Sequence, residues 1–119
     1  MNKKRTNPAF LNGVPELLIL HLLSRRPMHG YELVQAIKAA TDQEFEFGEG
    51  CIYPILHRLE AQALLRGTRE MVSGRSRVVY GVTTKGNKQL SGSVTCWQRV
   101  VRAVNHALQG GEHGEPALA

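Results

Sequence analysis

Residues 49–83 read EGCIYPILHRLEAQALLRGTREMVSGRSRVVYGVT, and this stretch decides the fold. In its first part, apolar residues recur at helical spacing and predict an amphipathic helix over residues 49–62. The inward stripe of this helix consists of Ile52, Ile55, Leu56 and Leu59. In its second part, β-branched residues over 65–72 and 77–83 flank a glycine-containing turn at 73–76, which predicts a β-hairpin. A hairpin is too small to be stable alone, so helices must cover one of its faces.

Three further helices follow from the same periodicity. Residues 14–24 are apolar on most sides, with Pro15 suited to a first helical turn, and residues 29–40 carry one apolar face. A last helix is predicted to begin at a Thr84 cap and to run to about residue 109. Three helices, a hairpin and a fourth helix are the element order of a winged helix-turn-helix. We therefore expect a mainly α fold with a small β-hairpin, in which a winged helix-turn-helix is followed by a C-terminal dimerisation helix.

The chain of 119 residues is 42% hydrophobic and 21% charged, which is the size and composition of one globular domain. We divide it into a flexible basic arm over residues 1–10, a winged helix-turn-helix DNA-binding domain over 11–85, a dimerisation helix over 86–109 and a disordered tail over 110–119. The longest apolar run is too short for a membrane span, and residues 1–8 lack the apolar stretch of a signal peptide. Two cysteines exclude a disulfide-dense secreted scaffold, so we expect a cytoplasmic location.

The helix over residues 49–62 has an outer face that suits DNA. Opposite the apolar stripe are Gly50, Pro54, His57 and Ala61, and the flanks carry Cys51, Tyr53 and Arg58. Small residues beside one imidazole and one guanidinium allow a helix to lie close in a major groove. We expect His57 and Arg58 to reach base edges and Tyr53 to lie nearer the backbone. The alternative is an ordinary solvated face of a core helix.

The hairpin carries a large share of the positive charge. From Arg66 to Arg77 there are four arginines and one acid, Glu70, so this segment contributes +3 to the formal net charge of +5. Arg75 and Arg77 bracket the turn and are predicted phosphate anchors. Arginines also protect exposed strand edges, which is the alternative interpretation. A candidate recognition helix followed directly by a cationic hairpin favours DNA binding.

The last helix carries a heptad pattern. Its apolar positions, spaced 4, 3, 4, 3 and 4 residues apart, are Leu90, Val94, Trp97, Val101, Val104 and Leu108. This spacing is typical of a helix that packs along a partner helix, and a dimer would present two recognition helices to a twofold operator. Packing within the same chain is the alternative. Trp97 is either a knob in the dimer seam or part of the wall of an effector pocket.

Several motifs resemble those of the PadR family of bacterial transcriptional regulators. The matching stretches are ELLILHLL at residues 16–23, PMHGYEL at 27–33, EGCIYPILHRLE at 49–60, GRSRVVY at 74–80 and VTTKG at 82–86. The resemblance covers about residues 11–86. In addition, the last helix, with its tryptophan, is similar to that of the short branch of the family.

This resemblance implies a homodimeric repressor that binds double-stranded, pseudo-palindromic operator DNA and is associated with the bacterial nucleoid when bound. It implies that Tyr31 and Tyr53 lie at the DNA-facing side and that the wing reaches the phosphate backbone. It also implies that the last helix forms the dimer with help from the first helix, which carries Leu17 and His21. Many members release DNA when a small aromatic or phenolic effector binds at the dimer interface, so such an effector is an expected partner.

Cys51 departs from the family pattern, which has Thr or Ser at this position, and Gly48 replaces a serine-like cap. We therefore expect Cys51 at about the third helical position, where a thiol hydrogen-bonds a phosphate poorly. A cysteine near a helix N-terminus is also a redox candidate, although the neighbouring Glu49 opposes a thiolate. Two alternatives to an effector-released repressor follow. One is a redox-responsive repressor switched through Cys51, and the other is a winged-helix interaction module that does not bind DNA.

Metal binding and catalysis are not expected. The five histidines never fall at i, i+4 spacing, and the sequence has no Cys-x-x-Cys pair. It has neither a recognisable nucleophile motif nor a phosphate-binding glycine loop. We therefore expect no metal, no cofactor, no enzymatic activity and no membrane partner.

Overall fold

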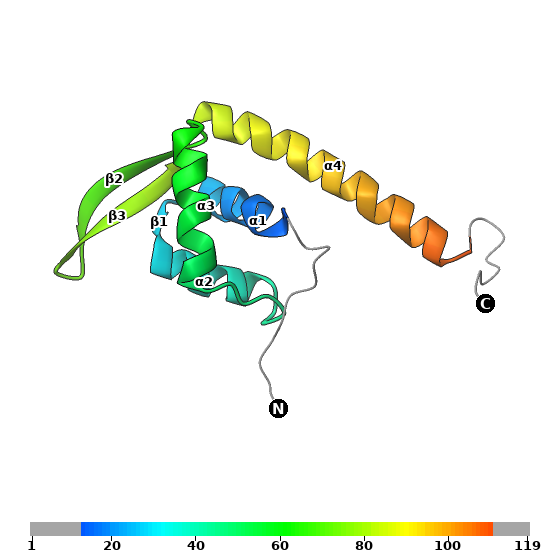
Figure 1. The fold of residues 1–119 in the computed structure, drawn as a ribbon, viewed down its shortest axis with the longest axis horizontal. Helices are drawn as coiled ribbons and strands as arrows, with labels where there is room; N and C mark the ends of the chain where they lie inside the picture. Colours follow the sequence, from blue (N-terminus) through cyan, green and yellow to red (C-terminus); the bar gives the residue numbers. More distant parts are fainter. Residues whose placement is uncertain (1–12, 111–119) are drawn as a thin grey trace.

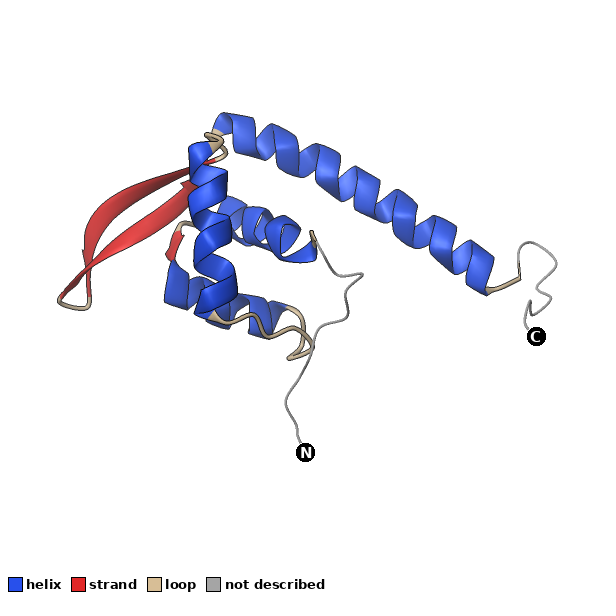
Figure 2. Cartoon of the chain, in the orientation of Figure 1, coloured by secondary structure: helices blue, strands red, loops and turns tan. Residues whose placement is uncertain are grey.

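The computed structural model describes residues 13–110, and its elements follow the expected order (Figure 1, Figure 2). The helices and strands are α1 (Val14–Arg25), β1 (Met28–His29), α2 (Gly30–Ala40), α3 (Glu49–Ala61), β2 (Leu65–Val72), β3 (Arg75–Val82) and α4 (Thr84–Leu108). The prediction of a mainly α fold with a small hairpin is therefore confirmed. The arm predicted over residues 1–10 and, apart from its first residue, the tail predicted over 110–119 lie outside the described residues.

The sheet is antiparallel, with strand order β1-β3-β2, and β2 and β3 pair over their whole length. The turn between them consists of Ser73 and Gly74, whose φ angles of 51° and 80° are the positive values that a type I′ hairpin turn requires. Because this turn is so tight, β3 begins at Arg75 rather than at residue 77 as predicted. The two-residue strand β1 was not predicted, since two residues are too few to show strand alternation.

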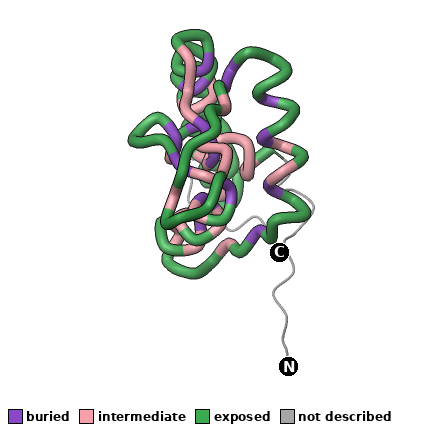
Figure 3. Tube along the Cα trace, turned by 90° about the vertical axis from the view of Figure 1, so that its left-hand side faces the viewer, coloured by how far each residue is buried: buried purple, intermediate pink, exposed green. Residues whose placement is uncertain are grey.

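The core lies where α1, α2 and α3 meet one another and the base of the hairpin. Figure 3 shows how the buried positions are distributed along the chain. Its most deeply buried side chains are Ile19, Leu20, Leu33, Ile37, Ile52, Leu56 and Leu59. Each such side chain stabilises the fold by about 1.5–3 kcal/mol relative to an exposed position. The sheet contributes Leu65 and Tyr80, so the hairpin is covered by helices on one face as its small size demands.

Thr83 is the residue that starts α4. Its hydroxyl accepts a hydrogen bond from the Gly86 N–H at 3.0 Å and donates one to the Ala63 carbonyl at 2.7 Å. The prediction that Thr84 caps this helix is therefore wrong by one residue. The physical reason is the second bond, because it ties the cap to the loop that follows α3, a contact 20 residues distant along the chain.

Helix α4 extends away from the three-helix core on the side opposite the hairpin (Figure 1). It has 25 residues, and only Gly86 and Leu90 among them are buried. At about 1.5 Å per residue it is much longer than its contact with α1 requires. No helix in the described part of the chain is long and apolar enough to cross a membrane.

Candidate nucleic-acid interface

The outer face of α3 has the composition that its periodicity predicts. Ile52, Leu56 and Leu59 are buried, and Ile55 is half-buried. The opposite side is exposed and consists of Gly50, Pro54, His57 and Ala61. On this side, only small side chains cover the backbone of the first two turns of α3. The His57 imidazole follows them on the same face. A surface of this kind allows close approach of a helix to base edges.

Arg58 and Tyr53 are not on that open face. The Arg58 Nη2 atom lies 2.6 Å from Oε1 of Glu16, which belongs to α1, so its guanidinium is directed toward the first helix. The Tyr53 ring is half-buried and occupies the space that a side chain on Gly30 would need. Tyr53 also lies beside His57, with ring centroids 6.2 Å apart. Gly30 is therefore required so that α2 and α3 can meet at this point.

Alternation divides the hairpin, or wing (residues 65–82), into two faces. Arg69 shares the α3-facing side with Gly67 and Met71, and its Nη1 donates a hydrogen bond to Ser76 Oγ on β3 at 3.0 Å. Arg66 lines the opposite face with Thr68 and Glu70. Arg69 contributed to the predicted charge of the wing but was not singled out as a site residue. Arg69 lies two residues after Gly67 on the same strand. Once the register is known, strand alternation therefore places it on the α3-facing side.

A polar recess of about 290 Å³, here called the α3–wing recess, separates α3 from the wing. It is lined by His29, Tyr53, His57, Arg69, Ser76, Arg77, Val78 and Tyr80. Burial raises the pKa of Tyr80, with further contributions from the nearby charge of Glu60 and from Tyr53. The Tyr80 hydroxyl therefore keeps its proton at neutral pH and remains a hydrogen-bond donor.

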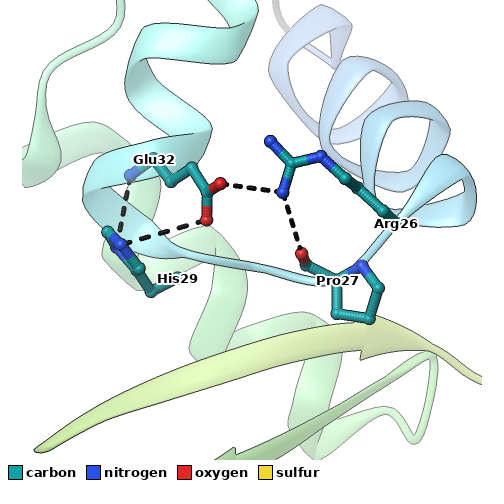
Figure 4. A network of polar contacts seen from close by, with 4 residues as sticks. All are labelled: Arg26, Pro27, His29 and Glu32. Atoms are coloured by element: carbon teal, nitrogen blue, oxygen red, sulfur yellow. Dashed lines mark hydrogen bonds and ion pairs between the residues drawn. The ribbon is translucent and has the colours of Figure 1, made fainter. Parts of the chain in front are cut away.

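A small polar network sets the start of α2 (Figure 4). His29 is the N-cap, and its Nδ1 accepts a hydrogen bond from the Glu32 N–H at 3.3 Å. The Glu32 carboxylate lies 2.7 Å from Arg26 Nη1, which also donates to the Pro27 carbonyl at 3.4 Å. This arrangement holds the first turn of α2, which carries the half-exposed Tyr31.

Between α1 and α4 lies a cavity of about 280 Å³. Its lining residues are Gly13, Val14, Glu16, Leu17, Leu20, Ser93, Cys96, Trp97 and Val100. Leu17 and Trp97 were expected at an effector site, and the fold brings them together. His21 is exposed on α1 and does not line this cavity.

The predicted apolar seam of α4 is divided between the core and the surface. Leu90 is buried, and Val94 and Val101 are half-buried. Trp97, Val104 and Leu108 are exposed, with 44%, 49% and 75% of their surfaces accessible. Val100, which the heptad pattern did not include, is 47% exposed and adds to the same apolar surface. Half of the six seam positions are therefore left uncovered by the described part of this chain.

Cys51 is the third residue of α3, as predicted, and its thiol is free and exposed. The N-cap of α3 is Gly48, which has no side chain that could accept a hydrogen bond from the first turn of the helix. Cys96 on α4 is also free and exposed. Within residues 13–110, no group of three or more His, Cys, Asp or Glu side chains is placed to hold a metal ion.

A three-helix core with a cationic antiparallel hairpin after its third helix defines a winged helix-turn-helix protein. Residues 19–92 match the family model described as the transcriptional regulator PadR-like family. The chain belongs to this family of transcriptional regulators.

Individual relatives agree with this assignment. The chain is 33% identical to the transcriptional regulator Rv3488 of Mycobacterium tuberculosis, over 80% of this chain and 86% of the relative. Among solved structures, the PadR-like transcriptional regulator of Bacillus cereus is 35% identical, with a TM-score of 0.75 over 86% of this chain and 98% of that one. A transcriptional regulator of Clostridium thermocellum matches with a TM-score of 0.76, at 23% identity over 82% and 96% of the two chains, and supports the fold alone.

Proposed function

We propose that the chain acts as a homodimeric repressor that binds a pseudo-palindromic operator and is released by a small aromatic effector. One observation carries the DNA-binding part of this proposal. The open face of α3, with His57 at its centre, lies across the α3–wing recess from Arg69, and Arg77 stands opposite Glu70 on the other face of the wing. A helix narrow enough for the major groove and cations for the adjacent phosphates are thus held by one rigid core.

Each candidate residue has a role in this proposal. His57 reads a base edge, and Gly50, Cys51 and Pro54 let the first turns of α3 approach the groove. Arg75 and Arg77 bind phosphates, while Tyr31 and Tyr53 lie nearer the DNA backbone. Arg58 reaches a base only when its ion pair with Glu16 opens, because the paired guanidinium is directed at α1.

The proposed dimer forms through α4. Trp97, Val100, Val104 and Leu108 form an apolar surface that the described part of this chain leaves open. The heptad spacing of Trp97, Val104 and Leu108 suits a second copy of the same helix, with Leu17 and His21 of α1 beside it. Two recognition helices about 34–36 Å apart would then match half-sites separated by one turn of DNA.

The proposed effector binds between α1 and α4. The cavity there is lined by Leu17 and Trp97, which suits a flat aromatic ligand, and Glu16 and Ser93 supply polar atoms. Because this cavity and the exposed seam share Trp97, a ligand at this place would act directly on the dimer. Quenching of Trp97 fluorescence by a panel of aromatic compounds tests for such a ligand.

The proposal is tested by selecting bound fragments from genomic DNA and measuring gel shifts on the selected and scrambled sequences. We expect preferential binding, a steep fall in affinity with rising salt, and a dimer in sedimentation. Insertion of the selected site into a reporter promoter distinguishes repression from activation. If the protein shows no salt-dependent affinity for any DNA, the protein-interaction module becomes the better interpretation.

A further inference from the structure

The α3–wing recess joins four elements of the fold at one polar site. His29 comes from β1, Tyr53 and His57 from α3, Arg69 from β2, and Ser76, Arg77, Val78 and Tyr80 from β3. Val78 is the only wholly apolar side chain among these eight residues. The site is therefore neither a gap in the hydrophobic core nor an ordinary apolar ligand pocket.

Arg69 supplies the fixed positive charge of this recess. Its hydrogen bond to Ser76 uses one of five guanidinium N–H donors and directs the group toward β3. Among the described residues, Arg69 forms no ion pair with a carboxylate, and Arg77 stands opposite Glu70 on the other face of the wing. Arg69 thus presents guanidinium donors at the recess that have no anionic partner in the described part of the chain.

Neither of the two acids near the recess lines it. Glu60 accepts a hydrogen bond from the Gly67 N–H at 3.2 Å, and Glu32 pairs with Arg26. Tyr53 and Tyr80 both line the recess, and burial together with the Glu60 charge raises the pKa of Tyr80, so its hydroxyl stays protonated. The recess therefore combines a guanidinium fork with neutral hydroxyl donors, and these are the groups that recognise a phosphate.

We propose that the α3–wing recess is a seat for one phosphate group, bound mainly by Arg69 and the Tyr53 hydroxyl. The phosphate belongs to the DNA backbone and lies between the wing and the major groove that α3 enters. This assignment rests on the proposed function. One phosphate would then bridge the recognition helix and the wing. Its role is to hold α3 in register while His57 reads the base edge.

The first experiment is a double-mutant cycle on a selected operator. Arg69→Gln and Tyr53→Phe should each weaken binding, by about 10- to 100-fold and by about 2- to 10-fold respectively. The fold-loss of affinity in the double variant should be smaller than the product of the two single fold-losses, because both side chains bind the same phosphate. Arg66→Gln is the matched control, since it removes the same charge from the opposite face of β2, and its effect should multiply with that of Tyr53→Phe.

The second experiment replaces operator phosphates one at a time with neutral methylphosphonates. At one position in each half-site, the replacement should weaken binding by the wild-type protein. At that position it should not weaken binding by Arg69→Gln any further, whereas it should still weaken binding by Arg66→Gln. If the methylphosphonate weakened binding by Arg69→Gln and by the wild type equally at every position, the assignment to the DNA backbone would be overturned. Circular dichroism melting of each variant checks that the fold is intact.

The third experiment needs no DNA, so it separates the seat from the proposed function. Inorganic phosphate is titrated into the ¹⁵N-labelled full chain while the Arg69 Nε–H and Ser76 amide signals are followed by NMR. We expect saturable shifts of both signals in the wild-type protein, and the shift of the Ser76 amide should disappear in Arg69→Gln. The shifts could saturate while no methylphosphonate position depends on Arg69. That result would mean that the seat serves a free phosphorylated ligand, and it would overturn the DNA assignment. Absence of a saturable shift in the wild-type protein would overturn the seat itself.

Discussion

Glu16 of α1 and Arg58 of α3 form an ion pair of 2.6 Å, and Glu16 also lines the cavity between α1 and α4. One carboxylate therefore contacts both the proposed recognition helix and the proposed effector site. A ligand that draws Glu16 toward the cavity would release the Arg58 guanidinium from α1. The pair would then connect the two proposed sites directly.

Glu16→Gln should therefore tighten DNA binding by about 2- to 5-fold, because a freed Arg58 can approach DNA. The pair is substantially exposed, so stability should fall by only about 0.2–1 kcal/mol. Gel shifts and urea unfolding measure the two effects. Glu46→Gln is the control, since it removes the same charge from a pair with Lys38. Equal tightening in both variants would mean that net charge alone is responsible.

Arg75→Ala and His57→Ala should weaken binding in different ways. Arg75 lies beside the wing turn and is exposed, so its loss should weaken all sequences alike and reduce the salt slope by about 0.9. His57 lies on the open face of α3, so its loss should mainly change which sequences are preferred. Gel shifts on operator and scrambled DNA at several salt concentrations test both. Equal loss of preference in the two variants would contradict this division.

The sequence predicted what depends on local spacing. The stripe of Ile52, Leu56 and Leu59 identified the inner face of α3, and therefore also its open face. Arg58 had no such signal, because its partner is 42 residues away and spacing along the chain does not report long-range pairs. Arg69 was missed for a related reason. Its orientation depends on strand register, which a tight Ser73-Gly74 turn sets and which the predicted longer turn left undefined.

Cys51 provides a test of the redox alternative. We expect wild-type protein to bind DNA equally well in peroxide and in reductant, and Cys51→Ser to bind at least as tightly, since a hydroxyl is the better phosphate donor. Gel shifts after oxidation and after reduction make the comparison. Cys96→Ser, which removes the other exposed thiol, is the control. Release of the wild type by peroxide, with retention of Cys51→Ser, would establish a thiol switch instead.

Tyr80 should make stability depend on pH in the alkaline range. Its pKa is raised in the fold, chiefly by burial, whereas in the unfolded chain a tyrosine has a pKa of about 10. The unfolded state therefore loses its proton first, and stability should fall as pH rises above about 10. Urea unfolding between about pH 8 and 11 measures this fall. It should be smaller in Tyr80→Phe and unchanged in Tyr31→Phe, whose ring is half-exposed.

Val104 tests the α4 dimer separately from the fold. Its side chain is 49% exposed in a single chain, so Val104→Asp should leave the melting temperature of the monomer nearly unchanged. In a dimer the same carboxylate would be buried against an apolar helix without a partner, which should weaken association by at least about 10-fold. Sedimentation equilibrium measures the dissociation constant. His106→Asp places the same group on the outer side of the heptad and should have little effect. If both variants remain dimeric at the same concentration, the copies associate through another surface.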